Sequence, residues 1–395
     1  MVLVLHYENK ANTKLGKMKI LSISVPMDIR YGGPPQAIKE ILASLSKLNW
    51  NCSLIVAGQS GKSKANSKAL FDYLESSSVS VNSFRFLLNN VYGFFIPFQS
   101  KKIVSLLKDV DLVLFHQIYT FANLFFYFKV KSFGIPYVVM PHGSLTNYHE
   151  KHHAFRKRLY MKVFGYRFLE NCEQILVASL IEGEQVNREF QEKVRIVGLG
   201  IPKEITTTRS VNAKKEEKRV LFLGRITSKK RLDLVISAVA ELINGGEPVC
   251  LDIAGTGKSR LVNKLHKQAV AMNIEKSVLF HGWVTGVDKK SLMHTADYFI
   301  LPSEEENFAI AVAECLAMGI PCIVSRNVAL SSLVETFHAG AVIEQLNSTE
   351  ISNAISNLVR ENQDILANNA LVASQELNWD RVAIVWDKFL RELVN

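Results

Sequence analysis

The sequence predicts an α/β protein made of two doubly wound domains, each built on a parallel sheet. The chain has 395 residues, enough for two domains with separate hydrophobic cores. Short apolar runs alternate with longer segments of helical periodicity in both halves, which is the pattern of repeated βαβ units. A polar segment, 203–218, interrupts this alternation and is typical of a linker. We therefore expect a tail at 1–17, domains at 18–200 and 201–377, and a terminal helix at 378–395.

The composition is that of an ordinary globular protein, with 48% hydrophobic and 21% charged residues. The five cysteines form no C-x-x-C pair and lie mostly in apolar runs. We expect them to be reduced core residues of a cytoplasmic protein, with neither a disulfide framework nor a metal site. No cofactor is expected either.

The net charge of +10 is unevenly distributed along the chain. Residues 1–200 hold 25 Lys and Arg against 14 Asp and Glu, whereas residues 201–395 hold 22 against 23. A basic first half favours an anionic surface as partner, although a solvated surface that keeps the protein soluble explains the same excess.

A membrane-spanning helix or a secretory signal is not expected. Residues 112–128 carry no formal charge, but His116, Gln117 and Asn123 interrupt them. A strand, a polar loop and a short helix explain the run better. The apolar start of the chain, residues 1–6, is too short for a signal sequence.

In the first half, a strand at 18–25 leads through Gly32 and Gly33 into a helix at 36–48. A glycine turn between a strand and a helix allows the backbone to approach a phosphate closely, although such a turn is more often only a turn. Residues 58–100 show no clear period, and the Ser/Lys-rich part, 60–68, is typical of a mobile loop. Further strands are expected at 52–57, 111–116, 137–140 and 175–178.

In the second half, a strand at 219–223 ends in Gly224 and Arg225, and Lys230 follows before a helix at 232–243. An arginine can fork onto two phosphate oxygens and a lysine adds a point charge, so this strand end suits a phosphate. A basic loop without a ligand is the alternative. Later strands are expected at 249–254, 278–283, 296–301 and 322–325.

The segment 302–325 joins the last two of these strands through an acidic loop and an apolar helix. Glu306 stands at the expected helix start and Glu314 eight residues later, about 12 Å along the axis at 1.5 Å per residue. The helix N-terminus between them favours an anion. A diphosphate with a hydroxyl-rich ring at each end would fit, and a solvated acidic helix start is the simpler alternative.

The same segment resembles the retaining glycosyltransferases of family 4, which have the GT-B fold. The resemblance rests on E-x7-E behind Pro-Ser, with Asn307 and Phe308 after the first Glu and A-M-G-I-P after the second. A Gly-Gly loop, a P-H-G motif at His142 and G-R-x4-K at 224–230 follow the family's order over most of the chain from Met18. Two residues depart from the pattern, because Ala309 and Arg231 stand where the family usually or frequently has Gly. The identity of the transferred sugar is therefore not inferred from the family.

The resemblance implies two Rossmann-like domains that face a central cleft, with the terminal helix packed back on the first domain. His142 would approach the donor sugar, and the strand ends at Gly257, Gly282 and Val284 would flank the sugar diphosphate and the base. The implied catalytic residues are His142, Glu306, Arg225 and Lys230. The implied donor-binding residues are Gly32, Gly33, Gly224, Arg225, Lys230, Gly257, Gly282, Val284, Glu306, Asn307, Phe308 and Glu314.

The implied activity is transfer of a hexose from a nucleotide-sugar to a lipid-linked or saccharide acceptor in polysaccharide biosynthesis, with retention of configuration. No metal would be needed, because helix N-termini, Arg225 and Lys230 can neutralise the leaving diphosphate. A cluster of six Lys and Arg among aromatics at 149–168 suits peripheral docking on the inner, anionic face of a membrane. The cluster alone does not discriminate between a membrane and nucleic acid, because nucleic acid would use the same residues.

Other activities stay open for the same sequence. A nucleotide-sugar epimerase and a sugar phosphorylase can use the same fold. A basic nucleic-acid-binding protein is the non-enzymatic alternative. It is disfavoured because the strand-end motifs lie in the neutral half, so we expect no nucleic-acid partner.

Overall fold

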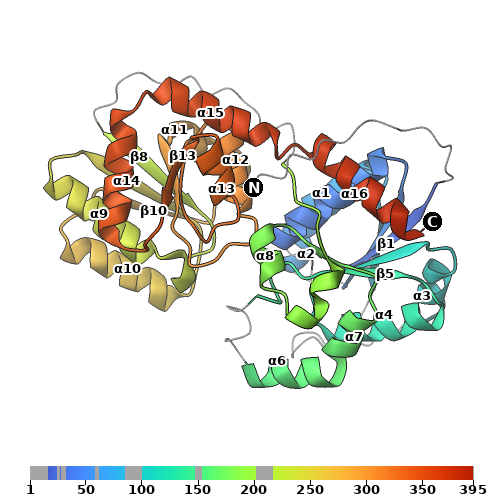
Figure 1. Cartoon of the computed structure of the whole chain (residues 1–395). Coiled ribbons are helices and arrows are strands. Elements are labelled where there is room, and N and C mark those ends of the chain that lie inside the picture. The colour runs from blue at the N-terminus through green and yellow to red at the C-terminus, as the bar shows by residue number, and fades with distance from the viewer. Residues whose placement is uncertain are drawn as a thin grey trace. The chain divides into compact units, whose positions relative to one another are not determined.

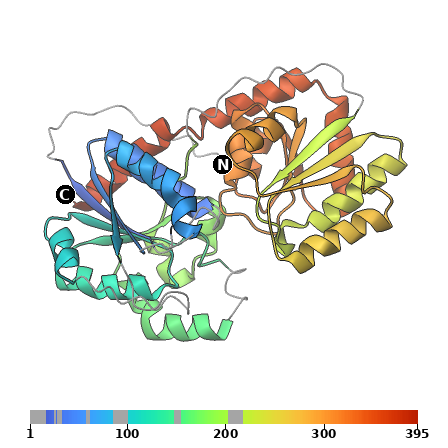
Figure 2. The same ribbon diagram turned by 180° about the vertical axis from the view of Figure 1, so that it is seen from behind.

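The computed structural model describes residues 17–24, 27, 33–57, 62–84, 100–146, 154–201 and 217–394. The chain divides into two compact units (Figures 1 and 2). Of the described residues, the N-terminal unit holds 17–199 and 379–394, and the C-terminal unit holds Gly200–Asn378. Gly32, most of the expected linker and tail, and residues 149–153 of the basic cluster lie outside the described residues.

The N-terminal unit is built on a seven-stranded sheet in the order β3-β2-β1-β4-β5-β6-β7, and every pairing is parallel. The central strands are buried on both faces, as parallel sheets covered by helices require, which explains their continuous apolar runs. The strands are β1 (Lys19–Ile23), β2 (Asn51–Ala57), β3 (Ser80–Phe84), β4 (Leu112–His116), β5 (Tyr137–Met140), β6 (Ile175–Val177) and β7 (Val194–Ile196).

Helices cover both faces of this sheet (Figure 1). They are α1 (Gly33–Lys47), α2 (Lys62–Ser76), α3 (Ser100–Leu107), α4 (Phe121–Ser132), α6 (Ala154–Tyr160), the π-helix η2 (Met161–Gly165), α7 (Tyr166–Glu170), α8 (Leu180–Glu184) and the 3₁₀-helix η3 (Arg188–Lys193). The strand, loop and helix expected across 112–128 are confirmed as β4 and α4. No helix in the described ranges is both long and apolar enough to cross a membrane.

The expectation of an irregular segment over 58–100 is wrong for its first part. Residues 62–84 form α2 and β3, and the Ser/Lys-rich start of α2 is helical rather than a loop. Leu70 and Leu74 are buried one turn apart, and the Ser67 hydroxyl donates a 2.8 Å hydrogen bond to the carbonyl of Met27. Tertiary packing therefore stabilises a helix whose own composition does not indicate one. The aromatic residues from 85 onward lie outside the described residues.

The terminal helix α16 (Trp379–Val394) packs against α1 and the turn that follows it, far from α16 in sequence. Trp386 is fully buried and its indole donates to the carbonyl of Gly198 at 3.2 Å. The Trp50 indole donates to Asp387 at 2.6 Å, and Arg391 donates to the carbonyl of Leu48 at 3.0 Å. The last helix of the chain is thus part of the N-terminal unit.

The C-terminal unit has a six-stranded parallel sheet in the order β10-β9-β8-β11-β12-β13. Counted within each unit, both sheets begin with the order 3-2-1-4-5-6 of doubly wound folds. The strands are β8 (Lys218–Leu223), β9 (Val249–Ala254), β10 (Val278–Gly282), β11 (Tyr298–Leu301), β12 (Cys322–Ser325) and β13 (Gly340–Ile343). The prediction of two doubly wound α/β domains is confirmed.

The helices of this unit also lie on both faces of its sheet (Figure 2). They are η5 (Ser228–Lys230), α9 (Leu232–Asn244), α10 (Ser259–Ala271), α11 (Gly286–Thr295), α12 (Ile310–Ala317), α13 (Ser331–Thr336), α14 (Ser348–Arg360) and α15 (Gln363–Gln375). The five cysteines of the chain are free and buried, as the sequence predicts.

Candidate functional site

The candidate donor site lies at the point where the strand order of the C-terminal sheet reverses. β8 pairs with β9 on one side and with β11 on the other, so the loops after β8 and β11 leave the sheet side by side. Ligands of doubly wound sheets bind outside the carboxyl ends of the strands at this point. The loop after β8 carries Arg225 and Lys230, and the loop after β11 carries Glu306, Asn307 and Phe308.

Three cations gather after β8. Burial lowers the pKa of the Lys230 ammonium well below its ordinary value, and the charges of Lys229 and Arg225 lower it further. Burial also lowers the pKa of Lys229, and Arg225 adds to that effect. Cations that repel one another in a partly desolvated place are stabilised by an added anion. Lys229 belongs to this cluster, although sequence reasoning singled out only Arg225 and Lys230.

The loop after β11 is held in place by backbone hydrogen bonds to two other segments. The amide of Glu304 donates to the carbonyl of Lys229 at 2.8 Å, which ties the acidic loop to the cation cluster. The amide of Glu306 donates to the carbonyl of Asn327 at 3.1 Å, and the amide of Ala329 donates to the carbonyl of Glu306 at 2.9 Å. This frame brings the side chains of Glu306 and Lys230 together as an ion pair.

The prediction that Glu306 starts the helix is wrong. α12 begins at Ile310, and Glu306 lies in the preceding loop, where its backbone bridges to Val328. The three residues between Glu306 and Ile310, which are Asn307, Phe308 and Ala309, are also outside the helix, and Ala309 adopts a left-handed conformation with φ of 64°. The axial estimate of about 12 Å between the two glutamates therefore does not apply, because only the last part of the segment is helical.

Glu314 lies within α12 and is already paired. The Lys289 ammonium, on α11, donates a 2.5 Å hydrogen bond to its carboxylate. The Glu314 side chain is 12% exposed and that of Lys289 is 31% exposed. A ligand hydroxyl that binds Glu314 must share the carboxylate with this lysine. Sequence reasoning did not single out Lys289, because α11 has no motif that marks it.

Two glycines that follow β9, Gly255 and Gly257, are explained by the packing of the chain itself. A Cβ atom on Gly255 would lie 1.8 Å from the carbonyl oxygen of Gly224, and one on Gly257 would lie 2.2 Å from that of Ile226. The two strand extensions therefore pass each other at backbone contact. Gly257, expected at the sugar diphosphate, is required by this approach whether or not a ligand is present. The adjoining strand end holds Gly282, with φ of 68°, and the half-buried Val284.

The remaining two residues expected around the donor are largely buried. Phe308 is 7% exposed. The Asn307 side-chain oxygen is buried and has no hydrogen-bond partner among the described residues. Such an orphaned acceptor beside the cation cluster is free to accept from a ligand hydroxyl.

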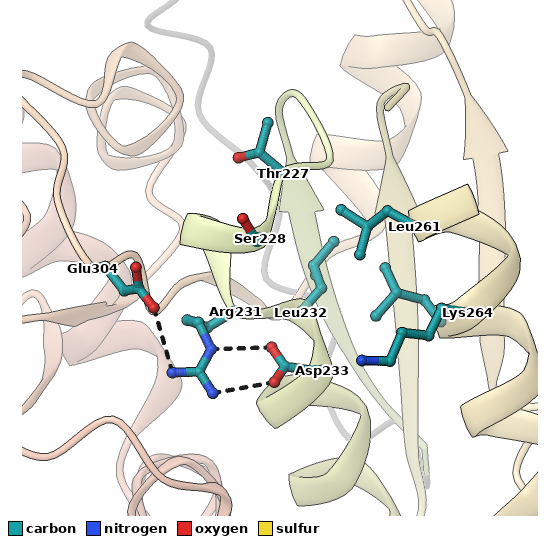
Figure 3. A pocket seen from close by; sticks show the side chains of 9 residues that line it. Thr227, Ser228, Arg231, Leu232, Asp233, Leu261, Lys264 and Glu304 are labelled. Atoms are coloured by element: carbon teal, nitrogen blue, oxygen red, sulfur yellow. Dashed lines mark hydrogen bonds and ion pairs between the residues drawn. The ribbon is translucent and has the colours of Figure 1, made fainter. Parts of the chain in front are cut away.

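A hollow of about 160 Å³ lies beside this loop, between the starts of α9 and α10 (Figure 3). Arg231 crosses it and binds both oxygens of Asp233 at 3.1 Å, while Glu304 approaches the same guanidinium at 3.6 Å. None of the predicted donor-binding residues lines it. Its lining residues are Thr227, Ser228, Arg231, Leu232, Asp233, Leu261, Lys264, Leu265 and Glu304.

The two other predicted residues that the structure describes belong to the N-terminal unit. Gly33 is the exposed first residue of α1, followed by Pro34 and Pro35 in the first turn, where proline is tolerated. His142 follows β5 in a left-handed conformation with φ of 50°. Its Nε2 lies 2.9 Å from Nδ1 of His116, at the end of β4. Burial lowers the pKa of His142 to about 4.

Glu182, which sequence reasoning missed, holds the turn that carries His142. Its carboxylate is buried and accepts from the amide of Gly143 at 2.5 Å and from that of Ala178 at 2.9 Å. The available signal was S-x-x-E at 179–182, which is typical of a helix start. The Ser179 side chain does cap α8, but the glutamate binds the P-H-G turn instead of closing a capping box.

No cluster of three His, Cys, Asp or Glu side chains suited to a metal ion occurs within the described part of the chain. The predicted residues that the structure brings together are Arg225, Lys230, Glu306 and Asn307. Each lies on one of the two adjoining loops of the C-terminal unit. Glu314 lies on the helix that continues the second loop.

Two doubly wound α/β units in one chain have the architecture of the GT-B fold, and solved structures bear this out. Anabaena HepE, solved with UDP and glucose, superposes with a TM-score of 0.75 at 19% identity, over 95% of this chain and 100% of that one. Sucrose-phosphate synthase from Thermosynechococcus elongatus superposes with a TM-score of 0.72 at 16% identity, over 95% and 99%. These likenesses establish the fold.

The family follows from two sequence models that together span 31–371. "Glycosyltransferase Family 4" matches residues 31–204, and "Glycosyl transferases group 1" matches residues 204–371. The chain belongs to the family 4 type of glycosyltransferases.

Curated relatives match shorter stretches of the chain. An uncharacterised glycosyltransferase of Methanocaldococcus jannaschii is 26% identical over 54% of this chain, and the alpha-monoglucosyldiacylglycerol synthase of Streptococcus pneumoniae is 30% identical over 45%. The matches span 58% and 42% of these relatives' own lengths.

Proposed function

We propose that this protein transfers a sugar from a nucleoside diphosphate sugar to an acceptor hydroxyl. The observation that carries the proposal is the cluster of Arg225, Lys229 and Lys230 at the switch point of the C-terminal sheet, with Glu306 paired to it. The cluster offers both a forked donor and point charges to a diphosphate. The HepE fold neighbour was solved with UDP and glucose, a ligand set that this chemistry suits.

In the proposed reaction, the bond from the anomeric carbon to the diphosphate breaks and its electron pair leaves with the diphosphate. The acceptor oxygen bonds to the same carbon from the same face, and its proton passes to the departing phosphate oxygen. Configuration is thereby retained without a covalent nucleophile. Arg225 and Lys230 stabilise the charge that develops on the leaving group. A bound metal is not required, because the cations of the chain supply that charge.

The ion pair between Lys230 and Glu306 gives the donor site two states. A diphosphate that binds Lys230 competes with the Glu306 carboxylate for it. The released carboxylate is then available to the hydroxyls of the transferred sugar. Donor binding and the positioning of Glu306 are coupled through one ammonium group.

The proposed acceptor is lipid-linked, at an anionic membrane surface. One relative is named for making a glucosylated diacylglycerol. In this chain, the contiguous helical segment 154–170 exposes four apolar side chains at spacings of four, four and three residues, so they share one face. They are Phe155 at 80%, Leu159 at 55%, Val163 at 52% and Tyr166 at 40% exposure.

Exposed cations accompany this apolar face, which we call the α6–α7 face. Arg158, Lys162 and Arg167 are exposed on the same segment. Apolar side chains with flanking cations suit a helix that lies in the plane of an anionic bilayer surface. Nucleic acid would be attracted by the cations and could stack on Phe155 and Tyr166, but it would gain little from the exposed aliphatic side chains of Leu159 and Val163 between them.

The experiment that tests donor binding is thermal-shift screening with nucleoside diphosphates and their sugars, since a ligand of the native state raises its stability. With the best diphosphate, Arg225→Ala and Lys230→Ala should each weaken binding by about 1.5–3 kcal/mol, the value of one charge-assisted hydrogen bond. Calorimetry measures the loss. Lys290→Ala, an exposed lysine elsewhere in the unit, is the matched control and should bind normally.

Two outcomes would refute the proposed function. The first is that no nucleoside diphosphate or nucleotide-sugar binds. The second is that donor is converted at full rate when no acceptor is present, or only when inorganic phosphate is added. Those results would point to an epimerase or to a phosphorylase, respectively.

A further inference from the structure

A chain of hydrogen bonds links three side chains at the switch point of the N-terminal sheet. β1 pairs with β4, and β4 pairs with β5, so the carboxyl ends of these strands lie side by side. The Ser22 hydroxyl on β1 lies 2.7 Å from Nε2 of His116 on β4. Nδ1 of His116 lies 2.9 Å from Nε2 of His142, two residues after β5.

The surroundings keep both histidines neutral. Ser22 is 0% exposed and His116 is 1% exposed. Burial lowers the pKa of His116 well below its ordinary value, and the proximity of His142 lowers it further. A neutral imidazole carries one proton, so each ring has one donor and one acceptor nitrogen. The three groups can then be arranged in only two ways, which differ in the direction of every hydrogen bond.

Ser22 decides between these two directions. Among the described residues, the bond to His116 is the only hydrogen bond of its hydroxyl. If His116 donated to Ser22, the buried hydroxyl proton would have no acceptor among the described residues, which is costly. If Ser22 donates to Nε2 of His116 instead, the buried hydroxyl proton and both ring nitrogens of His116 are satisfied. His116 then carries its proton on Nδ1 and donates it to Nε2 of His142, and the proton of His142 must be on Nδ1.

We propose that Ser22 and His116 are positioning residues that fix His142 as its Nδ1–H tautomer, so that it presents a hydrogen-bond donor to an oxygen of the ligand. The backbone supports this role. The left-handed conformation of His142 is uncommon for a residue with a side chain, and such conformations persist where surrounding contacts enforce them. Here Glu182 holds the next amide, and the Thr146 hydroxyl donates to the carbonyl of Gly143 at 3.0 Å.

The ligand part of this proposal rests on the proposed function, whereas the tautomer part does not. A neutral donor suits a sugar hydroxyl or a phosphate oxygen that accepts a hydrogen bond. It does not suit removal of a proton from the acceptor, because the free nitrogen already carries one. His142 would therefore bind and orient, and would not act as a general base.

The test is ¹⁵N NMR of the histidine side chains in the full chain without ligand, because the two tautomers give different ring-nitrogen shifts. The resonances of His116 and His142 are assigned by their loss in substituted proteins. We expect Nδ1–H for both rings at pH 7. His281 is an internal reference of the opposite kind, since its Nε2 lies 2.7 Å from the Asp252 carboxylate and must donate to it.

Two variants separate positioning from mere packing. In His116→Asn the amide nitrogen takes the place of Nδ1 and can only donate, so His142 should stay Nδ1–H. In His116→Leu the donor is lost, and His142 should move toward the Nε2–H form that an imidazole in water prefers. Once the nucleotide-sugar substrate is identified, turnover should fall about tenfold in His116→Leu, as expected for the loss of one hydrogen bond. Turnover should be largely kept in His116→Asn.

The proposal is overturned if His142 in the unsubstituted protein carries its proton on Nε2. It is also overturned if its tautomer is the same in His116→Leu. Neither result depends on whether the protein transfers sugar. Failure of the tautomer assignment and failure of the proposed function are therefore observed separately.

Discussion

At the scale of single residues, both departures from the family pattern fall on left-handed backbone. Arg231 has φ of 51° and Ala309 has φ of 64°. Glycine is frequent at such positions because it has no Cβ to clash. The backbone strain at Arg231 is offset by the contacts of its side chain with Asp233 and Glu304. Ala309 has no polar side chain with which to compensate.

Replacement of Ala309 by glycine should therefore relieve strain. A side chain in the left-handed region costs about 1–2 kcal/mol, and the greater freedom of unfolded glycine costs about 0.5–1 kcal/mol. We expect Ala309→Gly to raise the Tm of the C-terminal unit slightly, or to leave it unchanged. Differential scanning calorimetry measures this. Ala313→Gly, in the interior of α12, is the control and should lower the Tm. Equal losses in both variants would show that Ala309 is not strained.

The two glutamates near α12 should have different effects on ligand binding. Glu314→Ala should weaken the binding of nucleotide and nucleotide-sugar alike if its carboxylate grips the ribose. Glu306→Ala should not weaken the binding of free nucleotide, because the carboxylate that competes for Lys230 is removed. It should chiefly lower kcat, because that carboxylate serves the transferred sugar. Calorimetry and steady-state kinetics on the same proteins separate the two effects. Full turnover of Glu306→Ala at saturating donor would contradict the assignment.

At the scale of elements, strands with continuous apolar runs were predictable to within one or two residues at each end, as β1, β4 and β11 show against the expected 18–25, 111–116 and 296–301. β5, β9 and β12 have the bounds that their sequences indicate. Elements whose stability comes from contacts elsewhere were not. α2 begins in Ser- and Lys-rich sequence and depends on buried Leu70 and Leu74, which lie later in the helix.

In the candidate site, too, features set by local sequence were predictable and features set by distant contacts were not. Arg225 and Lys230 were predictable because a strand end followed by cations is a local pattern. The helix start was misplaced because the loop at 304–306 is held by backbone contacts with 229 and 327–329, far away in sequence. Lys229, Lys289 and Glu182 act through contacts that only the folded chain creates.

The terminal helix α16 offers an element-scale prediction. Trp386 is fully buried and bonds to Gly198, so its removal leaves a cavity and an unsatisfied carbonyl. Trp386→Ala should destabilise the N-terminal unit by about 3–5 kcal/mol. Hydrogen exchange resolved by segment measures this, with increased exchange expected in α1 and β2. Ile384→Ala, at an exposed position of the same helix, is the control. Equal exchange in both variants, or an effect confined to the C-terminal unit, would contradict this packing.

At the scale of the whole molecule, the excess positive charge belongs to one half of the chain. Residues 1–200 carry 25 basic against 14 acidic side chains, and residues 201–395 carry 22 against 23. The α6–α7 face lies in the basic half and combines cations with exposed apolar side chains. A surface with both features should bind membranes by two separable contributions. The cations supply long-range attraction, and the apolar side chains supply insertion.

The two contributions predict different responses to salt and to substitution. Each cation near an anionic lipid surface contributes about 1 kcal/mol, and salt weakens it as the screening length falls below about 8 Å. Co-sedimentation with anionic and neutral vesicles, at low and high salt, measures binding. Replacement of Arg156, Lys157, Arg158, Lys162 and Arg167 by Gln should abolish the preference for anionic vesicles. Replacement of Phe155, Leu159 and Val163 by Ser should weaken binding and leave the remainder more sensitive to salt.

The matched control replaces three equally exposed apolar residues of the C-terminal unit, Val270, Val287 and Ile365, by Ser. This variant should bind vesicles like the unsubstituted protein, because the lost side chains lie in the unit without excess charge. Equal binding to neutral and anionic vesicles, or equal losses in the control and in the α6–α7 variant, would contradict docking through this face. A protein that fails this test but consumes a nucleotide-sugar only when an acceptor is present would still be a glycosyltransferase. Its acceptor would then be sought among soluble sugars, because a face that does not touch the bilayer cannot present a lipid-linked one.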